Sequence, residues 1–115
     1  MINTSLNVQQ KVFVIFELNA DGTVLYFRDA GNGFASDLQP NPIGHNFFEI
    51  TLFENAEELR HRFNNFIKGH DTVENFKTTL SVANDLLPAR VMLMRVFERS
   101  NNERAQSVIV DIRSV

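Results

Sequence analysis

Five runs of β-branched and aromatic residues, separated by polar and turn-forming segments, predict five β-strands in this chain. They span residues 11–18, 23–27, 72–82, 89–98 and 106–112. The Asp21-Gly22 pair between the first two runs favours a tight turn, so we expect these strands to form a hairpin. Turn-rich residues 83–88 and polar residues 99–103 separate the last three runs.

The middle of the chain has a helical period instead. Asn55 can cap a helix whose third position is Glu58, and Gly69 ends the pattern. Between the cap and this glycine, apolar residues recur every three or four positions: Leu59, Phe63, Phe66 and Ile67. The pattern predicts an amphipathic helix with one apolar face.

Just before this helix, Phe47-Phe48 follows a Pro-Ile-Gly turn and precedes the apolar residues Ile50, Leu52 and Phe53. This composition predicts a short buried helix that walls a core or a pocket. Residues 28–44 have no regular period and contain several glycines and prolines, so we expect loops with one helical turn near residues 34–38.

The order of these elements is two strands, a mostly helical middle and three strands. It predicts an α+β fold, a five-stranded antiparallel sheet with helices on one face. A chain of 115 residues suffices for one core. We therefore expect one domain over residues 11–115, preceded by an N-terminal segment at residues 1–10.

Composition removes several classes of function. The net charge of −3 supplies no basic surface for nucleic acid, and the lack of cysteine excludes disulfides and thiolate chemistry. The sequence shows no nucleophile paired with a base, no glycine-rich phosphate loop, and no histidines or carboxylates at the spacing of metal ligands, so an enzyme is not expected. The N-terminus does not resemble a signal peptide and no apolar run could cross a bilayer, which predicts a cytoplasmic protein with no membrane partner.

Two segments resemble the PAS domain family, and within it the photoactive yellow protein branch. They are residues 19–25, Asn-Ala-Asp-Gly-Thr-Val-Leu, and residues 43–48, Ile-Gly-His-Asn-Phe-Phe, with Phe63 and Phe76 at similar spacing. The resemblance extends over residues 11–115 and implies the PAS arrangement of helices on one face of the sheet. It also implies a sensory or interaction role.

The chemistry of that photoreceptor branch does not carry over to this chain. The resemblance places Phe27 and Gly31 where its phenolate-binding tyrosine and glutamic acid would stand, and residues 51–55 contain no chromophore cysteine. A buried phenolate needs hydrogen-bond donors, which Phe and Gly side chains do not supply. Light sensing by that route is therefore not expected.

A PAS arrangement would bring a set of aromatic and apolar side chains together between the sheet and the helices. As a ligand pocket for a small apolar molecule, this set comprises Phe16, Phe27, Phe34, Phe48, Leu59, Phe63 and Phe66. The alternative is that the same rings only fill the core, as a small domain requires. Eleven phenylalanines against one tyrosine and no tryptophan favour a dry interior in either case.

Two further groups bear on the ligand. Some PAS sensors bind haem b through a histidine on the long helix, which makes His45, His61 and His70 weak haem-ligand candidates. The helical phase points His61 away from the apolar face, where Leu59 lies instead. Both faces of the strand that contains Arg95 are apolar, so the pattern leaves its direction open. An outward-facing surface charge is favoured, because unpaired arginines are rarely buried. If Arg95 faced the pocket instead, it could hold a ligand carboxylate.

These observations predict a stand-alone PAS-like module that binds a small apolar ligand and acts through dimerisation or a signalling partner protein. A haem sensor and a structural dimerisation domain with a filled core are the alternatives. A homodimer is expected because Phe13, Ile15 and Ile109 should face away from the helices, where a sheet open to water would carry polar residues.

Overall fold

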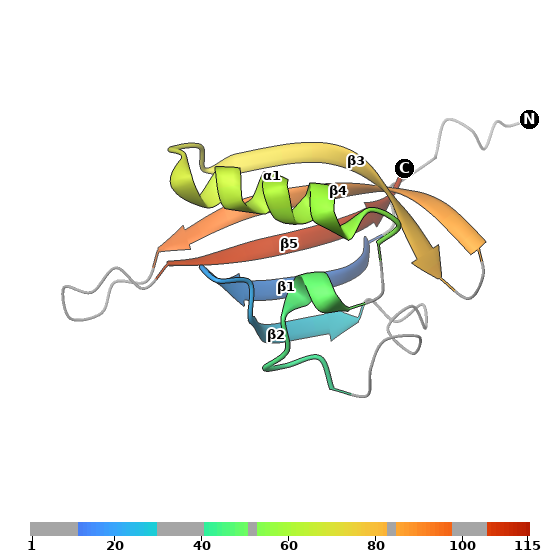
Figure 1. Ribbon diagram of the computed structural model, residues 1–115, viewed down its shortest axis with the longest axis horizontal. Coiled ribbons are helices and arrows are strands. Elements are labelled where there is room, and N and C mark those ends of the chain that lie inside the picture. The colour runs from blue at the N-terminus through green and yellow to red at the C-terminus, as the bar shows by residue number, and fades with distance from the viewer. Residues whose placement is uncertain (1–11, 30–40, 51–52, 83–84, 98–105) are drawn as a thin grey trace, which may run out of the picture.

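The computed structural model describes residues 12–29, 41–50, 53–82, 85–97 and 106–115. Its elements are β1 (Val12–Asn19), β2 (Val24–Asp29), the 3-10 helix η3 (Phe47–Glu49), α1 (Ala56–Lys68), β3 (Val73–Val82), β4 (Asp85–Phe97) and β5 (Gln106–Ser114). The five strands form one sheet in the order β2-β1-β5-β4-β3, and neighbouring strands are antiparallel. Helices α1 and η3 lie over one face (Figure 1). The predicted α+β class is confirmed.

The β1–β2 hairpin closes through a turn with its own hydrogen bonds. The Asn19 side chain accepts from the backbone N–H groups of Asp21 and Thr23, and Gly22 takes a φ of 90°, which favours glycine. The Asp21 carboxylate accepts from the Thr23 hydroxyl at 2.7 Å and from the Thr23 N–H, and these bonds lower the pKa of Asp21. The predicted hairpin is thus held by local side-chain chemistry.

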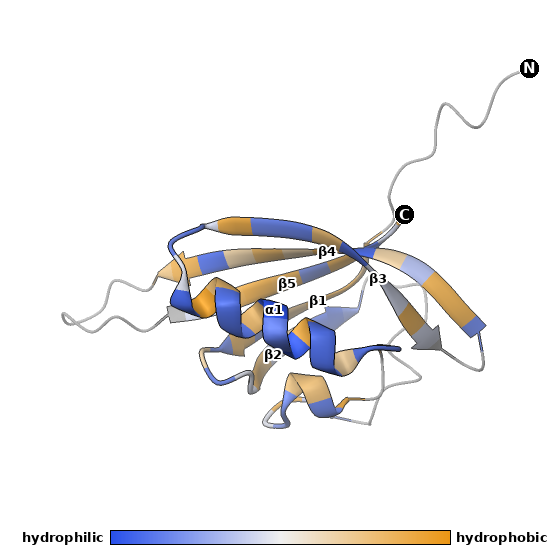
Figure 2. Cartoon of the chain, turned by 45° about the horizontal axis from the view of Figure 1, so that its top comes forward, coloured by the Kyte–Doolittle hydropathy of each residue, from blue (hydrophilic) through white to orange (hydrophobic). Residues whose placement is uncertain are grey.

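Both helices begin at an asparagine cap, of which Asn55 was predicted and Asn46 was not. Asn46 Oδ1 accepts from the Phe48 N–H at the start of η3, and Asn55 Oδ1 accepts from the Glu58 N–H at the start of α1. Helix α1 stops at Gly69. The strands behind α1 are mostly hydrophobic, whereas the exposed side of α1 is mostly hydrophilic (Figure 2). Its buried residues are Leu59, Phe63 and Phe66, the predicted apolar face.

Strand β4 is longer than its pattern predicted, because it begins at Asp85 rather than at residue 89. Pro88, expected in a turn, lies inside the strand opposite Thr79 of β3. Pairing of β4 with β5 starts only at Ala89, so the strand has one partner at Pro88. A proline there does not interrupt a doubly paired ladder, which explains why the strand tolerates it. The predicted helical turn at residues 34–38 lies outside the described residues.

The core lies between the sheet and the two helices. Alternate residues of the central strand β5 and its neighbour β1 supply part of its floor, and all are fully buried: Val14, Phe16 and Leu18 from β1, and Val108, Val110 and Ile112 from β5. A chain of edge-to-face ring contacts runs over this floor, from Phe16 to Phe47, Phe48 and Phe63, with centroids 4.9 to 5.4 Å apart. These rings pack on one another directly.

The opposite face, which we call the outer face, carries half-buried apolar side chains. They are Ile15 of β1, Met92, Met94 and Val96 of β4, and Ile109 of β5. Asp111, only 4% exposed, pairs there with Arg113 through bonds of 2.9 and 3.0 Å, and this carboxylate raises the pKa of the Arg113 guanidinium. Phe13, expected on this face, is instead partly buried against the core cluster, at an irregularity in the β1–β5 register.

Candidate functional site: a pocket beside the β3–β4 hairpin

The segment between η3 and α1 is fastened to the edge of the sheet. Phe53 forms an isolated antiparallel bridge with Leu80 of β3, and the Glu54 N–H donates to the Thr79 carbonyl at 3.0 Å. Strand β3 is the last strand in the sheet order, so its outer edge is available for these bonds. This attachment places η3 and the start of α1 beside the β3–β4 hairpin.

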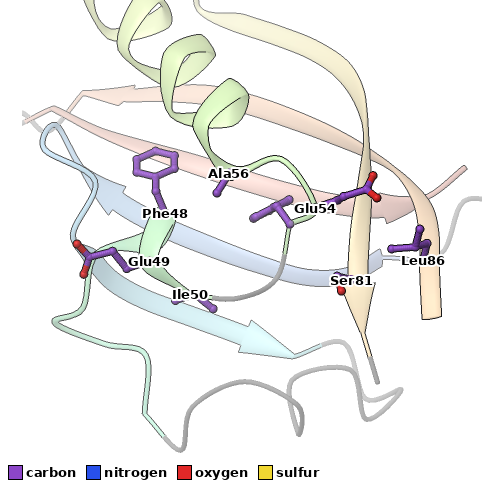
Figure 3. Close-up of a pocket in the computed structure, with 8 residues that line it drawn as sticks. Phe48, Glu49, Ile50, Glu54, Ala56, Ser81 and Leu86 are labelled. Carbon is purple, nitrogen blue, oxygen red and sulfur yellow. The ribbon is translucent and has the colours of Figure 1, made fainter. Parts of the chain in front are cut away.

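A pocket of about 400 Å³ lies between these elements. In Figure 3 the lining comes from three places. Phe48 and Glu49 belong to η3 and Ile50 follows it, Glu54 precedes α1 and Ala56 begins it, and Ser81 and Leu86 belong to the hairpin. Phe53 completes the lining. The volume falls in the range of small-molecule sites, roughly 300 to 1,000 Å³, and five of the eight lining residues are apolar.

Charge in the pocket is of one sign. Glu49 and Glu54 are its ionisable lining residues, Ser81 adds a hydroxyl, and none of the lining residues is basic. Arg60 of α1 lies nearby, with its guanidinium carbon 5.1 Å from the centre of the Phe48 ring, but it forms an ion pair with Glu57 at 3.4 Å. The described lining is therefore apolar and acidic.

Most of the predicted pocket residues are core residues. Phe16, Leu59, Phe63 and Phe66 are each at most 3% exposed. Phe27 is partly buried, with its ring stacked 6.1 Å from that of Phe16, and Phe34 lies outside the described residues. Phe48 alone of the predicted set lines the described pocket. A ligand site among the other rings stays a prediction.

Arg95 faces the helices and contacts the end of α1 rather than the pocket. Its guanidinium donates to the carbonyls of Phe66, Ile67 at 3.4 Å, Gly69 at 3.3 Å and Asp71 at 3.0 Å. It also lies over the Phe66 ring, with the guanidinium carbon 4.7 Å from the ring centroid. The side chain thus caps the helix C-terminus and ties it to β4. Arg95 is therefore not the outward-facing surface charge that the sequence favoured. A contact between Arg95 and a ligand carboxylate stays untested.

The fold of this chain resembles that of solved structures whose sequences differ from it. No protein-family model and no curated protein match the chain. The PAS domain of an HTR-like protein from Haloarcula marismortui matches 95% of this chain and 84% of its own, with a TM-score of 0.61 and 16% identity. The chain has the PAS fold.

Two further solved structures share this PAS fold and hold small molecules. One is the PAS-B domain of Drosophila melanogaster Cycle with bound ethylene glycol, at a TM-score of 0.63 and 12% identity over 86% of this chain and 96% of that chain. The other is the PAS domain of the Cronobacter turicensis RpfR quorum-sensing receptor in complex with C12:0. Its TM-score is 0.61 and its identity 13%, over 93% of this chain and 96% of that chain. Identities this low establish the fold alone.

Within the PAS fold of this chain, the histidines lie away from the described pocket. His61 is on the exposed side of α1, as its helical phase predicted, and His45 and His70 are exposed in the flanking loops. None of the three lines the pocket. Among the described residues, no group of three or more histidine, cysteine or acidic side chains could hold a metal. Nor does any described helix have the length and apolarity to cross a membrane.

The sequence indicated one wall of the pocket and missed the other. The cluster of Ile50 and Phe53 after Phe47-Phe48 was predicted to wall a core or a pocket, and both line it. Ser81 and Leu86 gave no such signal, because the segment between them was expected to be an ordinary turn. Their place follows from the attachment of Phe53 to Leu80, which joins positions distant in the sequence.

Proposed function

We propose that this chain is a sensory or interaction module that binds a small, mainly apolar ligand in the pocket beside the β3–β4 hairpin. It acts by binding rather than by catalysis. The observation that carries the proposal is the pocket itself, with its apolar lining and a volume of about 400 Å³. The PAS fold adds support, since two neighbours are described with a bound small molecule.

The output of such a module requires a second protein, because binding energy must alter an assembly or a partner to become a signal. We propose that this partner is a second copy of the chain, packed through the outer face. That face carries Ile15, Met92, Met94 and Ile109, each half-buried. Asp111 is the most buried carboxylate of this face, and its bidentate pair with Arg113 neutralises it. A second copy that covered Asp111 would therefore bury no unpaired charge at this position.

Native mass spectrometry of the purified protein tests the ligand proposal. A co-purified small molecule, or binding of added 1-octanol at a ratio of one to one, is the expected result. Ser81→Trp places a large ring in the pocket from an exposed strand position and should abolish this binding without unfolding the domain. Asn64→Trp, at an exposed position on α1, is the control and should bind normally. Binding unaffected by Ser81→Trp would place the ligand elsewhere.

The direct ring-to-ring contacts of the core favour a second candidate, a dimerisation domain whose core is filled. In that case no ligand binds, while the outer face still associates. The haem alternative has no histidine at the described pocket to support it. A stoichiometric Soret shift on adding ferric haem, lost in one histidine variant, would restore it.

A further inference from the structure

The backbone of Glu54 has a defined place beside the pocket, and its side chain is exposed. Its backbone N–H is bonded to Thr79 and its neighbour Phe53 is bridged to Leu80, so the residue is held against the edge of β3. In Figure 3 its carboxylate lies on the side of the pocket formed by Ser81 and Leu86. The Glu49 carboxylate lies on the opposite side, beyond η3.

No cation within the described chain neutralises Glu54. The ion pairs there join arginines to Glu57, Glu58, Glu74 and Asp111, and none includes Glu54. Arg60, whose guanidinium lies over the ring of the lining residue Phe48, is paired with Glu57. A ligand that enters the pocket therefore meets an apolar surface with one unpaired negative charge at its hairpin side.

The amino end of α1 acts in the opposite sense, since a helix N-terminus favours anions. Here that end already has its own acceptors and charges. Asn55 Oδ1 accepts from the Glu58 N–H, and Glu57 and Glu58 stand in the first turn. The cap and the two glutamates weaken the attraction of this helix end for a ligand carboxylate. Because Glu57 and Glu58 also pair with Arg60 and Arg62, the selection for charge rests on the Glu54 carboxylate.

We propose that the pocket selects an amphiphile with a positively charged head, an alkyl or aryl amine, over a carboxylic acid of the same shape. The apolar body contacts Phe48, Ile50, Phe53 and Leu86, while the ammonium group lies against Glu54 and can donate to the Ser81 hydroxyl. This inference rests on the proposed function of the pocket and adds the ligand class to it.

Three probes that share the same alkyl chain distinguish the effect of the head group from binding of the chain itself. Octylamine, 1-octanol and octanoate are cationic, neutral and anionic at pH 7, and isothermal titration calorimetry gives the Kd of each. We expect octylamine to bind roughly tenfold more tightly than octanoate, the size of effect that a partly exposed charge pair provides beside apolar surface. Backbone amide shifts measured by NMR should report the contact at Ser81 and Leu86.

Glu54→Gln and Glu49→Gln form a matched pair of variants, because both remove one exposed carboxylate of the same lining. Glu54→Gln should bring octylamine and octanoate to within about twofold of each other, whereas Glu49→Gln should keep most of the preference. Equal binding of amine and acid by the unsubstituted chain, or an equal loss of the preference in both variants, would overturn the assignment.

The same probes distinguish failure of this inference from failure of the proposed function. If 1-octanol binds and neither charged probe is preferred, only the head-group inference fails. If none of the three probes binds, the proposed pocket function fails with it.

Discussion

Phe63 and His61 stand two positions apart on α1 and have opposite surroundings. Phe63 is 1% exposed and its ring centroid lies 5.2 Å from that of Phe48, whereas His61 is exposed. We expect Phe63→Ala to lower the free energy of unfolding by about 3 to 5 kcal/mol, because it leaves a ring-sized cavity. His61→Ala should change it by less than about 0.5 kcal/mol. Urea denaturation measures both, and a larger loss for His61→Ala would refute this account of the helix.

Gly22 and Gly44 allow backbone strain to be separated from a steric clash. Their φ angles are 90° and 88°, so alanine is strained at both. A Cβ at Gly22 would lie 2.8 Å from Cε2 of Phe48, whereas at Gly44 it would meet no atom within 4 Å. We expect Gly44→Ala to cost about 1 to 2 kcal/mol and Gly22→Ala at least about 1 kcal/mol more. Equal melting temperatures would show that Phe48 is free to move.

At the scale of single residues, burial of the strand positions could be predicted and the role of Arg95 could not. Alternation marks Val14, Phe16 and Leu18 as one face, and all three are fully buried. In β4 both faces are apolar, so period alone could not orient Arg95. Its direction is decided by the carbonyls at the end of α1, which come close only once the chain has folded.

At the scale of elements, Arg95 is the main polar link between α1 and the sheet, and its removal is a direct test. We expect Arg95→Met to lower stability by about 2 to 4 kcal/mol, because it leaves the carbonyls at the helix end without their charged donor. Arg95→Lys should recover part of this loss, since an ammonium cannot reach several carbonyls at once.

Arg62→Met is the matched control for Arg95→Met. Arg62 also lies 4.7 Å from a phenylalanine centroid, that of Phe76, but its polar partners are Glu58 and Glu74 at 3.7 and 3.4 Å. Such partly exposed pairs contribute little, so the control should cost less than about 1 kcal/mol. Chemical denaturation of the three variants checks this, and similar losses for Arg62→Met and Arg95→Met would mean that the ring contact dominates.

Local signals predicted the helices well. The predicted cap at Asn55 acts within three residues of the start of α1, and the period of α1 repeats within a turn. The pocket depends on distant pairing instead, where Phe53 meets Leu80. Because register between remote segments is set by the whole sheet, neither the early start of β4 nor the hairpin wall of the pocket could be predicted from the sequence.

At the scale of the whole molecule, the outer face predicts association. We expect a homodimer by sedimentation equilibrium at micromolar concentration, and Ile109→Asp should convert it to a folded monomer because a carboxylate would be buried in the interface. Ile15→Asp should act in the same way, and Phe13→Asp should destabilise the fold as well, since Phe13 packs against the core. Asn64→Asp, on the exposed side of α1, should remain dimeric. A monomeric unsubstituted chain would contradict the proposal.

The place of β5 between β1 and β4 has a consequence for biosynthesis. Ser107 donates to Glu17 across ninety positions of sequence, and the β1–β5 ladder joins the first described strand to the last. Until β5 leaves the ribosome, the β1–β2 and β3–β4 hairpins have no strand between them, and one edge of β1 lacks its partner. Pairing at such separation slows folding, so Val14, Phe16 and Leu18 stay incompletely covered until β5 has been made. Holdase chaperones that bind extended apolar segments would meet this first strand.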